Sequence, residues 1–384
     1  MTRPHKPTAR PAHVTSPRSG TVPSPSASPA RSRSLHALAA AAAVALLGTG
    51  VLTGCTTAQE AEANANASLS TTTCPVTTNS DVTGTVRIGY QAVPNANLLV
   101  KNQRWLENCF PHATISWLKF DSGADVVQAF GSGSVDLATL GSSPATKALS
   151  APLDIAIQVV WIDDIIGKAE SLVVRESGVT SIQQLRGKTI ATPFGSTSHY
   201  SLLQALSAAG LSSTDVKLVN LAPDKMMAAW QGNQMDAAWV WDPVLSQLTT
   251  TGHIITGSDA TAASGHPTFD LEGATTSFIQ SNASFMETWT SVEDYAVGQL
   301  AAHPDTAAQS IAVELGSTTD SVTTQLKGYV YPTAKQQVSL VKKLPSQLLA
   351  TAQFLKTQQG VDAVGSLNAY TAGVYTTAIT KVAS

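Results

Sequence analysis

The sequence contains little charge of either sign and few aromatic residues. Of its 384 residues, 13% are Asp, Glu, Lys or Arg, the formal net charge is -3, and Phe, Trp and Tyr together make up 6%. This balance leaves no basic stripe that would attract nucleic acid and no strongly acidic surface. We therefore expect no nucleic-acid partner, and other partners have to be inferred from individual sites.

Cysteine is scarce, and the motifs of common enzyme chemistries are missing. The three cysteines show no C-x-x-C spacing and the histidines do not cluster, so a metal or redox centre is not indicated. His199 lies beside Ser196 and Ser198, but no third orienting group and no G-x-S-x-G elbow accompany them. Residues 131–134 (GSGS) lack the spacing of a phosphate-binding loop. We expect neither catalysis nor a cofactor.

The N-terminal region has the pattern of a lipoprotein signal peptide. A polar, basic lead over residues 1–34 precedes an apolar run over residues 35–47 and the tetrapeptide LTGC at residues 52–55. A transmembrane anchor with an incidental cysteine is the alternative, but the apolar run is shorter than the roughly 20 residues that a spanning helix needs. We predict a signal peptide with a lipobox over residues 1–54, lipidation of Cys55, and a domain anchored to the outer face of the cell membrane.

Two cysteines remain, Cys74 and Cys109. An exported protein meets an oxidising environment, so we expect a disulfide between them, with two buried free thiols as the alternative. Residues 55–83 are rich in Ala, Thr, Asn and Ser and offer little apolar surface for burial. This composition predicts a flexible linker behind the lipid anchor.

Strand-like and helix-like segments alternate from residue 84 onward. About 300 residues remain there, enough for two α/β lobes with cores of their own. The alternation predicts an α/β fold of mainly parallel sheets flanked by helices. We expect strands at residues 85–90, 114–118, 154–161, 188–192, 216–221 and 236–241. Residues 291–384 are mostly helical in pattern, with breaks at Pro304, Pro332 and Pro345.

Two short polar turns, at residues 141–144 and 193–201, each join a strand-like run to the start of a helix. The first turn of a helix leaves backbone N–H groups without partners, and the helix dipole adds partial positive charge, so anions bind there. We expect Ser142 and Ser143 to cap a helix that begins at Pro144. The second turn offers Thr197, Ser198, His199 and Tyr200. Each turn alone is a plain helix cap, but the two together indicate an anion site.

Other candidate side chains lie at strand ends, where open α/β sheets bind ligands. They are Tyr90, Gln91, Glu170, Trp241, Asp242 and Asp270. Trp239 and Trp241 alternate along one strand, so one faces the core and the other the cleft, and we place Trp241 in the cleft. For Asp242 two interpretations stay open, a ligand contact or a cap on the helix that follows Asp242-Pro243.

Five stretches carry a resemblance to a known family. Residues 117–124 (WLKFDSGA), 140–144 (LGSSP), 193–201 (PFGSTSHYS), 228–231 (AAWQ) and 240–243 (VWDP) resemble the taurine-binding proteins of bacterial ABC importers. The resemblance implies a periplasmic-binding-protein fold, in which two lobes joined by crossover strands close over a sulfonate and deliver it to a membrane permease. We place the lobes at residues 84–175 and 176–265, with residues 266–384 returning to the first lobe as C-terminal helices.

The resemblance also implies roles for the candidate residues. Ser142, Ser143 and residues 197–200 would lie by the sulfonate, and Asp270 would face the ammonium group, with Glu170 as the second choice. A sulfonate stays ionised and has three acceptor oxygens, so it suits neutral N–H and O–H donors, whereas an ammonium group suits carboxylates. Trp241 and Tyr90 would pack against the spacer that joins the sulfonate and the ammonium group. The implied partners are taurine or a related sulfonate and the permease and ATPase subunits of an importer, with the protein itself a monomer.

Two rival classes of function use the same fold. A desulfinase needs a thiolate nucleophile in the cleft, but neither Cys74 nor Cys109 lies in a candidate ligand motif. A cytosolic enzyme of thiamine-pyrimidine synthesis would not carry a lipobox. Among importers, another alkanesulfonate, nitrate or a betaine is the alternative ligand. The carboxylates Asp270 and Glu170 favour a ligand that bears an amine.

Overall fold

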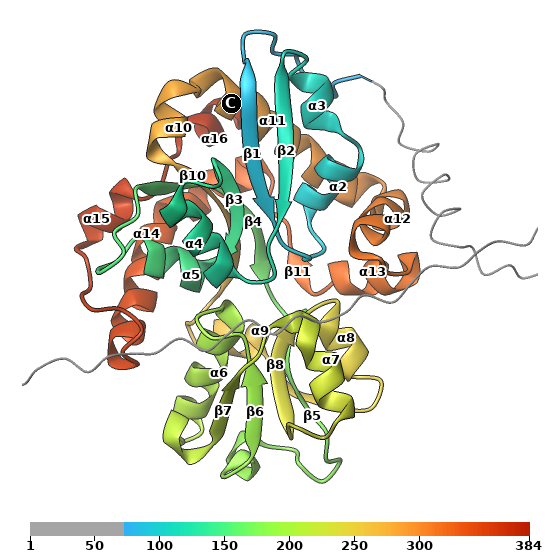
Figure 1. The fold of residues 1–384 in the computed structure, drawn as a ribbon, viewed down its shortest axis with the longest axis vertical. Coiled ribbons are helices and arrows are strands. Elements are labelled where there is room, and N and C mark those ends of the chain that lie inside the picture. Colours follow the sequence, from blue (N-terminus) through green and yellow to red (C-terminus); the bar gives the residue numbers. More distant parts are fainter. Residues whose placement is uncertain (1–72) are drawn as a thin grey trace, which may run out of the picture. The chain divides into compact units, whose positions relative to one another are not determined.

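A computed structural model describes residues 73–384 (Figure 1). The predicted signal peptide, the lipobox with Cys55, and most of the predicted linker lie outside the described residues. Within them, two separate sheets are each flanked by helices, which confirms the α/β fold class. We call the six-stranded sheet with its helices the first lobe, and the five-stranded sheet with its helices the second lobe.

The first sheet has the strand order β11-β4-β10-β3-β1-β2. Its strands are β1 (Gly84–Tyr90), β2 (Ala113–Lys119), β3 (Leu137–Gly141), β4 (Ile157–Ile166), β10 (Phe269–Thr275) and β11 (Tyr329–Val330). β1 is parallel to β2 and β3, whereas β10 runs antiparallel to both β3 and β4. The late strand β10 therefore enters the centre of the sheet and brings its residues beside the ends of β3 and β4.

The second sheet has the strand order β7-β6-β8-β5-β9. Its strands are β5 (Glu170–Val174), β6 (Thr189–Thr192), β7 (Lys217–Asn220), β8 (Ala237–Trp241) and β9 (His253–Gly257). β6 is parallel to β7 and β8, and β5 is antiparallel to β8 and β9. β5 and β8 are fully buried, as expected for central strands, and β8 is apolar throughout whereas β5 begins with Glu170 and Ser171.

Helices cover both sheets (Figure 1). In the first lobe they begin with α2 (Ala96–Asn102), α3 (Trp105–Cys109), α4 (Gly123–Ser132) and α5 (Ser142–Ala148). The second lobe holds η1 (Ile182–Leu185), α6 (Thr197–Ala208), η2 (Ser213–Asp215), α7 (Pro223–Gln231), α8 (Val244–Leu248) and α9 (Ser258–Ala263). The C-terminal part adds α10 (Thr276–Ser281), α11 (Ala283–Ala302), α12 (Pro304–Leu315), α13 (Thr319–Leu326), α14 (Ala334–Thr357), α15 (Leu367–Ala372) and α16 (Thr377–Val382).

Two of the three expected proline breaks coincide with helix boundaries. Pro304 opens α12, and Pro332 precedes α14, whose first turn is closed by a capping box between Thr333 and Gln336. The expected break at Pro345 was wrong, because this proline lies inside α14 and is buried. Packing of the apolar face of the helix outweighs the single backbone hydrogen bond that proline removes.

The chain passes between the lobes twice, between β4 and β5 and between α9 and β10. β5 already belongs to the second sheet, so the second lobe begins about residue 170 rather than at the expected residue 176. The return after residue 265 agrees with the start of β10 in the first sheet. Glu170 and Asp270 thus stand at the first residues beyond the two crossings.

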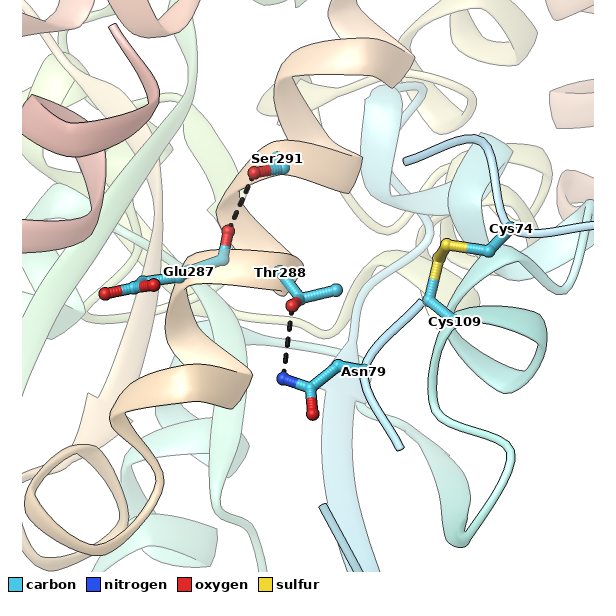
Figure 2. Close-up of a disulfide and its surroundings, with 6 residues drawn as sticks. All are labelled: Cys74, Asn79, Cys109, Glu287, Thr288 and Ser291. Carbon is cyan, nitrogen blue, oxygen red and sulfur yellow. Dashed lines mark hydrogen bonds between the residues drawn. A yellow bond between two sulfur atoms is a disulfide. The ribbon is translucent and has the colours of Figure 1, made fainter. Parts of the chain in front are cut away.

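The segment before β1 is packed against the first lobe, which differs from the expected linker. Cys74 and Cys109 form a disulfide, the pairing that the sequence led us to expect (Figure 2). Asn79 donates to the Thr288 hydroxyl of α11 at 3.3 Å, and Val82 is buried in the core. Residues 74–83 therefore form part of the folded lobe, because the disulfide holds a polar segment that has little apolar surface of its own.

No helix among residues 73–384 has both the length and the apolar character needed to cross a membrane.

Candidate functional site

A cavity lies between the lobes, at the carboxyl ends of β3 and β8. Its volume is about 20 Å³, measured as the space open to the centre of a water molecule. The first lobe contributes Gln91, Val93, Gly123, Gly141, Pro144, Ile166, Asp270 and Tyr329, and the second lobe contributes Glu170, Ser196, Thr197 and Trp241. A space of this size holds one or two water molecules, so a larger ligand enters only when the lobes part.

The structure brings five of the predicted ligand residues to this cavity. They are Gln91, Glu170, Thr197, Trp241 and Asp270. Seven others do not line it: Tyr90, Ser142, Ser143, Ser198, His199, Tyr200 and Asp242. The lining residues that sequence reasoning missed are mostly apolar or glycine, and among them Ser196 and Tyr329 carry hydroxyl groups.

The first polar turn does not have the predicted cap. α5 begins at Ser142 behind Gly141, without a side-chain cap, so the expectation that Pro144 begins the helix was wrong by two residues. The Ser142 hydroxyl accepts from the backbone N–H of Phe269 at 3.2 Å. The Ser143 hydroxyl donates to the Gly195 carbonyl in the other lobe at 3.2 Å. Both serine hydroxyls are thus bound to protein groups, and the backbone N–H groups of this turn stay as its donors.

The second polar turn is held together by its own side chains. The Ser196 hydroxyl caps α6 by accepting from the His199 N–H at 3.1 Å. The His199 ring stacks on Phe194, and its Nδ1 accepts from the Gly195 N–H at 3.2 Å. Burial and the nearby Lys147 ammonium group lower the pKa of His199 to about 4. His199 is therefore a neutral acceptor that shapes the turn.

Glu170 occupies the start of α6. Its carboxylate accepts from the Thr197 hydroxyl at 2.6 Å and from the Ser258 hydroxyl at 2.8 Å. Burial raises the pKa of Glu170, and the hydrogen bonds from Thr197 and Ser258 counteract that rise. The Thr197 hydroxyl, which sequence reasoning had assigned to a ligand, thus binds a carboxylate of the protein itself.

Asp270 is the carboxylate that faces the cavity from the first lobe. It is paired in register with Gly141 of β3 on one side and with Asp164 of β4 on the other. Burial and the Glu170 carboxylate raise the pKa of Asp270 to about 7. Asp164 was missed, although two acidic residues inside the otherwise apolar strand β4 are a detectable signal.

Two aromatic side chains line the cavity. Trp241 lines it while Trp239 is in the core of the second lobe, as expected. Residues two apart in a strand share a face, so Trp241 reaches the cavity because it is the last residue of β8. Tyr329 also lines the cavity, and its hydroxyl is buried without a hydrogen-bond partner. The carboxyl groups of Asp164, Asp242 and Asp270 add to burial in raising the pKa of Tyr329. The surroundings of the cavity are therefore strongly acidic.

Two predicted ligand residues have structural contacts elsewhere. Tyr90 packs edge-on against Trp117, with ring centroids 6.2 Å apart. The Asp242 carboxylate accepts from the Ser246 N–H at 3.0 Å, which is the capping alternative that the sequence left open. Asp242 does not line the cavity.

Tyr200 makes a contact between the lobes instead of a contact with the cavity. Its ring lies edge-on to Phe354 of α14, with centroids 5.3 Å apart, in a small cluster with Leu355 and Val361. Burial raises the pKa of Tyr200, and hydrogen bonds with Gln204 and with Thr351 of α14 lower it. The second lobe is held to the first at this point, away from the cavity.

Gly141 lies at a close contact between the two lobes. A Cβ atom at Gly141 would lie 2.7 Å from the Thr197 Cγ2 atom of the opposite lobe. The backbone of the first turn and the side chain of the second therefore touch in this closed arrangement.

No group of three or more His, Cys, Asp or Glu residues within residues 73–384 has a geometry suited to a metal ion.

The sequence matches one family model and several known binding proteins. The family model described as NMT1/THI5 like matches residues 118–307. The taurine-binding periplasmic protein of Escherichia coli (strain K12) is 35% identical over 261 residues, which cover 66% of this chain and 81% of that protein.

Solved structures match in fold. The alkanesulfonate-binding protein SsuA from Xanthomonas axonopodis pv. citri, bound to MOPS, has a TM-score of 0.63 at 24% identity, covering 76% of this chain and 98% of that chain. The desulfurization enzyme DSZB has a TM-score of 0.59 at 14% identity, covering 78% of this chain and 98% of that chain. The fold is thus shared by binding proteins and by an enzyme.

Proposed function

Because this chain belongs to the family of sulfonate- and taurine-binding periplasmic proteins of ABC importers, we propose that it captures taurine or a close aminosulfonate by lobe closure. In this proposal it delivers the ligand to the permease and ATPase subunits of an importer as a monomer. It acts outside the cytoplasm, as its relatives do, and the lipid on Cys55 holds it to the membrane.

The acidic lining of the cavity is the observation that carries the choice of ligand. Asp270 and Glu170 both line the cavity, and neither belongs to an ion pair among the described residues. Buried carboxylates without a cation are unfavourable unless they are protonated or matched by a charged ligand. An ammonium group supplies that charge, whereas nitrate and simple alkanesulfonates do not.

The starts of α5 and α6 support a sulfonate. They meet at the cavity, and their first backbone N–H groups have no intrahelical acceptors. Such donors suit an anion that stays charged at every physiological pH. The narrow cavity favours a short spacer between the two charged groups, as in taurine.

We propose that the protein has no catalytic activity. The desulfurization enzyme shares its fold, but the two cysteines in the described residues are bonded to each other in the disulfide. A thiolate nucleophile is therefore not offered by residues 73–384.

Isothermal titration of the purified protein without residues 1–55 tests this proposal. Any carried ligand is first removed by unfolding and refolding, and taurine, propanesulfonate, nitrate and glycine betaine are titrated. We expect micromolar or tighter binding of taurine and weak binding of propanesulfonate. Equal binding of both sulfonates would refute the ammonium site, and preferred binding of nitrate or betaine would refute the choice of an aminosulfonate.

A further inference from the structure

Three buried side chains near the cavity carry polar atoms that have no hydrogen-bond partner within residues 73–384. These atoms are both carboxyl oxygens of Asp164, the hydroxyl of Thr268 and the hydroxyl of Tyr329. Asp164 and Thr268 are at most 1% exposed, and Tyr329 is 6% exposed, so bulk solvent does not satisfy them. Buried polar groups are ordinarily hydrogen-bonded, and these exceptions therefore require an explanation.

Strand pairing places the three side chains on one face of the first sheet. Asp164 of β4 pairs directly with Asp270 of β10, and Tyr329 of β11 pairs directly with Ile166 of β4. Thr268 continues this ladder, since its carbonyl accepts from the Ile166 N–H at 3.0 Å. Direct partners share a face, and so do residues two apart along a strand. Ile166, Asp270 and Tyr329 line the cavity, so this face forms its first-lobe wall.

The neighbouring Tyr331 shows the contrast between a satisfied hydroxyl and an unsatisfied one. Its ring centroid lies 6.0 Å from that of Tyr329, and its hydroxyl donates to the Pro94 carbonyl at 2.6 Å. Tyr331 does not line the cavity. The described part of the chain thus supplies a partner to the tyrosine away from the cavity and none to the tyrosine that lines it. A polar group of a ligand is the natural partner of the Tyr329 hydroxyl.

An unsubstituted ammonium group has the charge, donors and size for this wall. The Asp270 carboxylate and the Tyr329 hydroxyl are acceptors, and an ammonium group offers a positive charge and three N–H donors. The cavity volume of about 20 Å³ leaves room for one or two water molecules, and an ammonium group is about as large as one. A methyl group on the nitrogen would remove one donor and need additional space in the closed cavity.

We infer that this face of the first sheet is an ammonium subsite that selects a primary amine, with Asp270 and the Tyr329 hydroxyl as its direct acceptors. This inference rests on the proposed function and narrows its ligands to aminosulfonates whose nitrogen carries only the spacer. Tyr329 is then a specificity-determining residue. Asp164 adds a second carboxyl group directly beside Asp270, behind the wall of the cavity.

N-methylated ligands test the selection of a primary amine. The same purified protein is titrated with taurine, N-methyltaurine and N,N-dimethyltaurine. We expect N-methyltaurine to bind about 10- to 100-fold more weakly than taurine and the dimethyl compound more weakly again, because each methyl group leaves a buried acceptor unpaired. Equal affinity for taurine and N-methyltaurine would overturn the inference and leave the proposed function in place. If none of the three binds, the proposed function fails and the inference fails with it.

Two tyrosine variants separate the loss of an acceptor from the size of the methyl group. Tyr329→Phe removes only the hydroxyl, so taurine should bind about tenfold more weakly and N-methyltaurine should lose less. The preference for the primary amine should therefore shrink. Tyr331→Phe is the matched control, since its hydroxyl is bonded to Pro94, and it should keep the preference. Equal losses of both ligands in Tyr329→Phe would overturn the role of its hydroxyl.

Thermal unfolding of the same variants without ligand keeps this inference distinct from the proposed function. Tyr331→Phe should lower the midpoint of unfolding, because the Pro94 carbonyl loses its donor. Tyr329→Phe should leave the midpoint unchanged or raise it, because the hydroxyl that it removes has no partner in the described residues. A similar fall in both variants would show that the Tyr329 hydroxyl is bonded within the protein, and the inference would fail even if taurine binds tightly.

Discussion

The acidic side chains and the helix starts at the cavity differ in the partners that they have. Asp270 and Tyr329 line the cavity and have no cationic partner in the described residues. At the starts of α5 and α6, the hydroxyls of Ser143 and Thr197 are already bonded to protein groups, and the donors left are backbone N–H groups. In the proposed function, single substitutions would therefore alter recognition by the acidic side chains, whereas recognition at the helix starts would depend on how the chain folds.

The largest loss of ligand affinity is expected from a substitution of Asp270. Asp270→Ala should weaken taurine binding by about 2–5 kcal/mol, because the ammonium group would be buried without its charge partner. Propanesulfonate, which has no ammonium group, should bind the variant as well as the original protein or better. Isothermal titration of both ligands checks this. Equal losses for the two ligands would show that Asp270 supports the fold of the cavity and does not read the ammonium group.

Gly141→Ala tests the contact between the starts of α5 and α6, where the backbone of one lobe touches a side chain of the other. The added Cβ atom would lie 2.7 Å from Thr197 Cγ2, so the closed arrangement would be strained and both sulfonates should lose affinity together. Gly298→Ala is the matched control, since no atom lies within 4 Å of its Cβ position. Small-angle scattering with and without ligand would report closure. Loss of taurine binding alone would contradict the role assigned to Gly141.

Closure should also depend on Tyr200, which lies outside the cavity. Tyr200→Ala removes the ring that packs on Phe354 between the lobes, and we expect a loss of about 1–2 kcal/mol in the affinity for both sulfonates. Tyr200→Phe keeps the ring and should lose less. Dissociation rates measured by stopped flow check this prediction, and a changed preference between the two ligands would instead place Tyr200 at the ligand.

The smallest effect distinguishes the two neighbouring serines. Ser143→Ala removes the hydrogen bond to Gly195 across the lobes and should weaken both sulfonates by about 0.5–1.5 kcal/mol. Ser142→Ala removes a bond to Phe269 within the first lobe, so it should lower thermal stability and leave affinity nearly unchanged. Titration and thermal unfolding of both variants check this. The opposite assignment of effects would mean that the Ser142 hydroxyl turns to the ligand.

Much of the fold was predictable because local patterns agree with it. The buried runs of β6 and β8 and the helix start at α6 follow from apolar periodicity and turn residues. Pro345 was misjudged, because a proline reads as a break in sequence while the packing of α14 tolerates it. The start of the second lobe was placed about six residues too late, because β5, which begins with a glutamate and a serine, was not predicted as a strand.

The candidate site residues also divide into those that local sequence predicts and those whose contacts only the fold decides. Trp241 stands at a strand end, and that position predicts exposure to a cleft, whereas the role of Asp270 was expected from the resemblance. Residues 197–200 were expected to meet a ligand, but β5 brings Glu170 to the Thr197 hydroxyl. Asp164 could not be linked to Asp270 from sequence, because 106 positions separate them and their pairing depends on β10 returning beside β4.

The sequence by itself determined the α/β class, the helix starts that offer N–H donors, and the positions of acidic residues at strand ends, because each depends on neighbours along the chain. The tertiary structure decided which hydroxyls were already bonded, which carboxyl groups became partners, and which aromatic ring joined the lobes. Those outcomes depend on the pairing of distant strands and on the closeness of the lobes, as when Thr197 meets both Glu170 and Gly141.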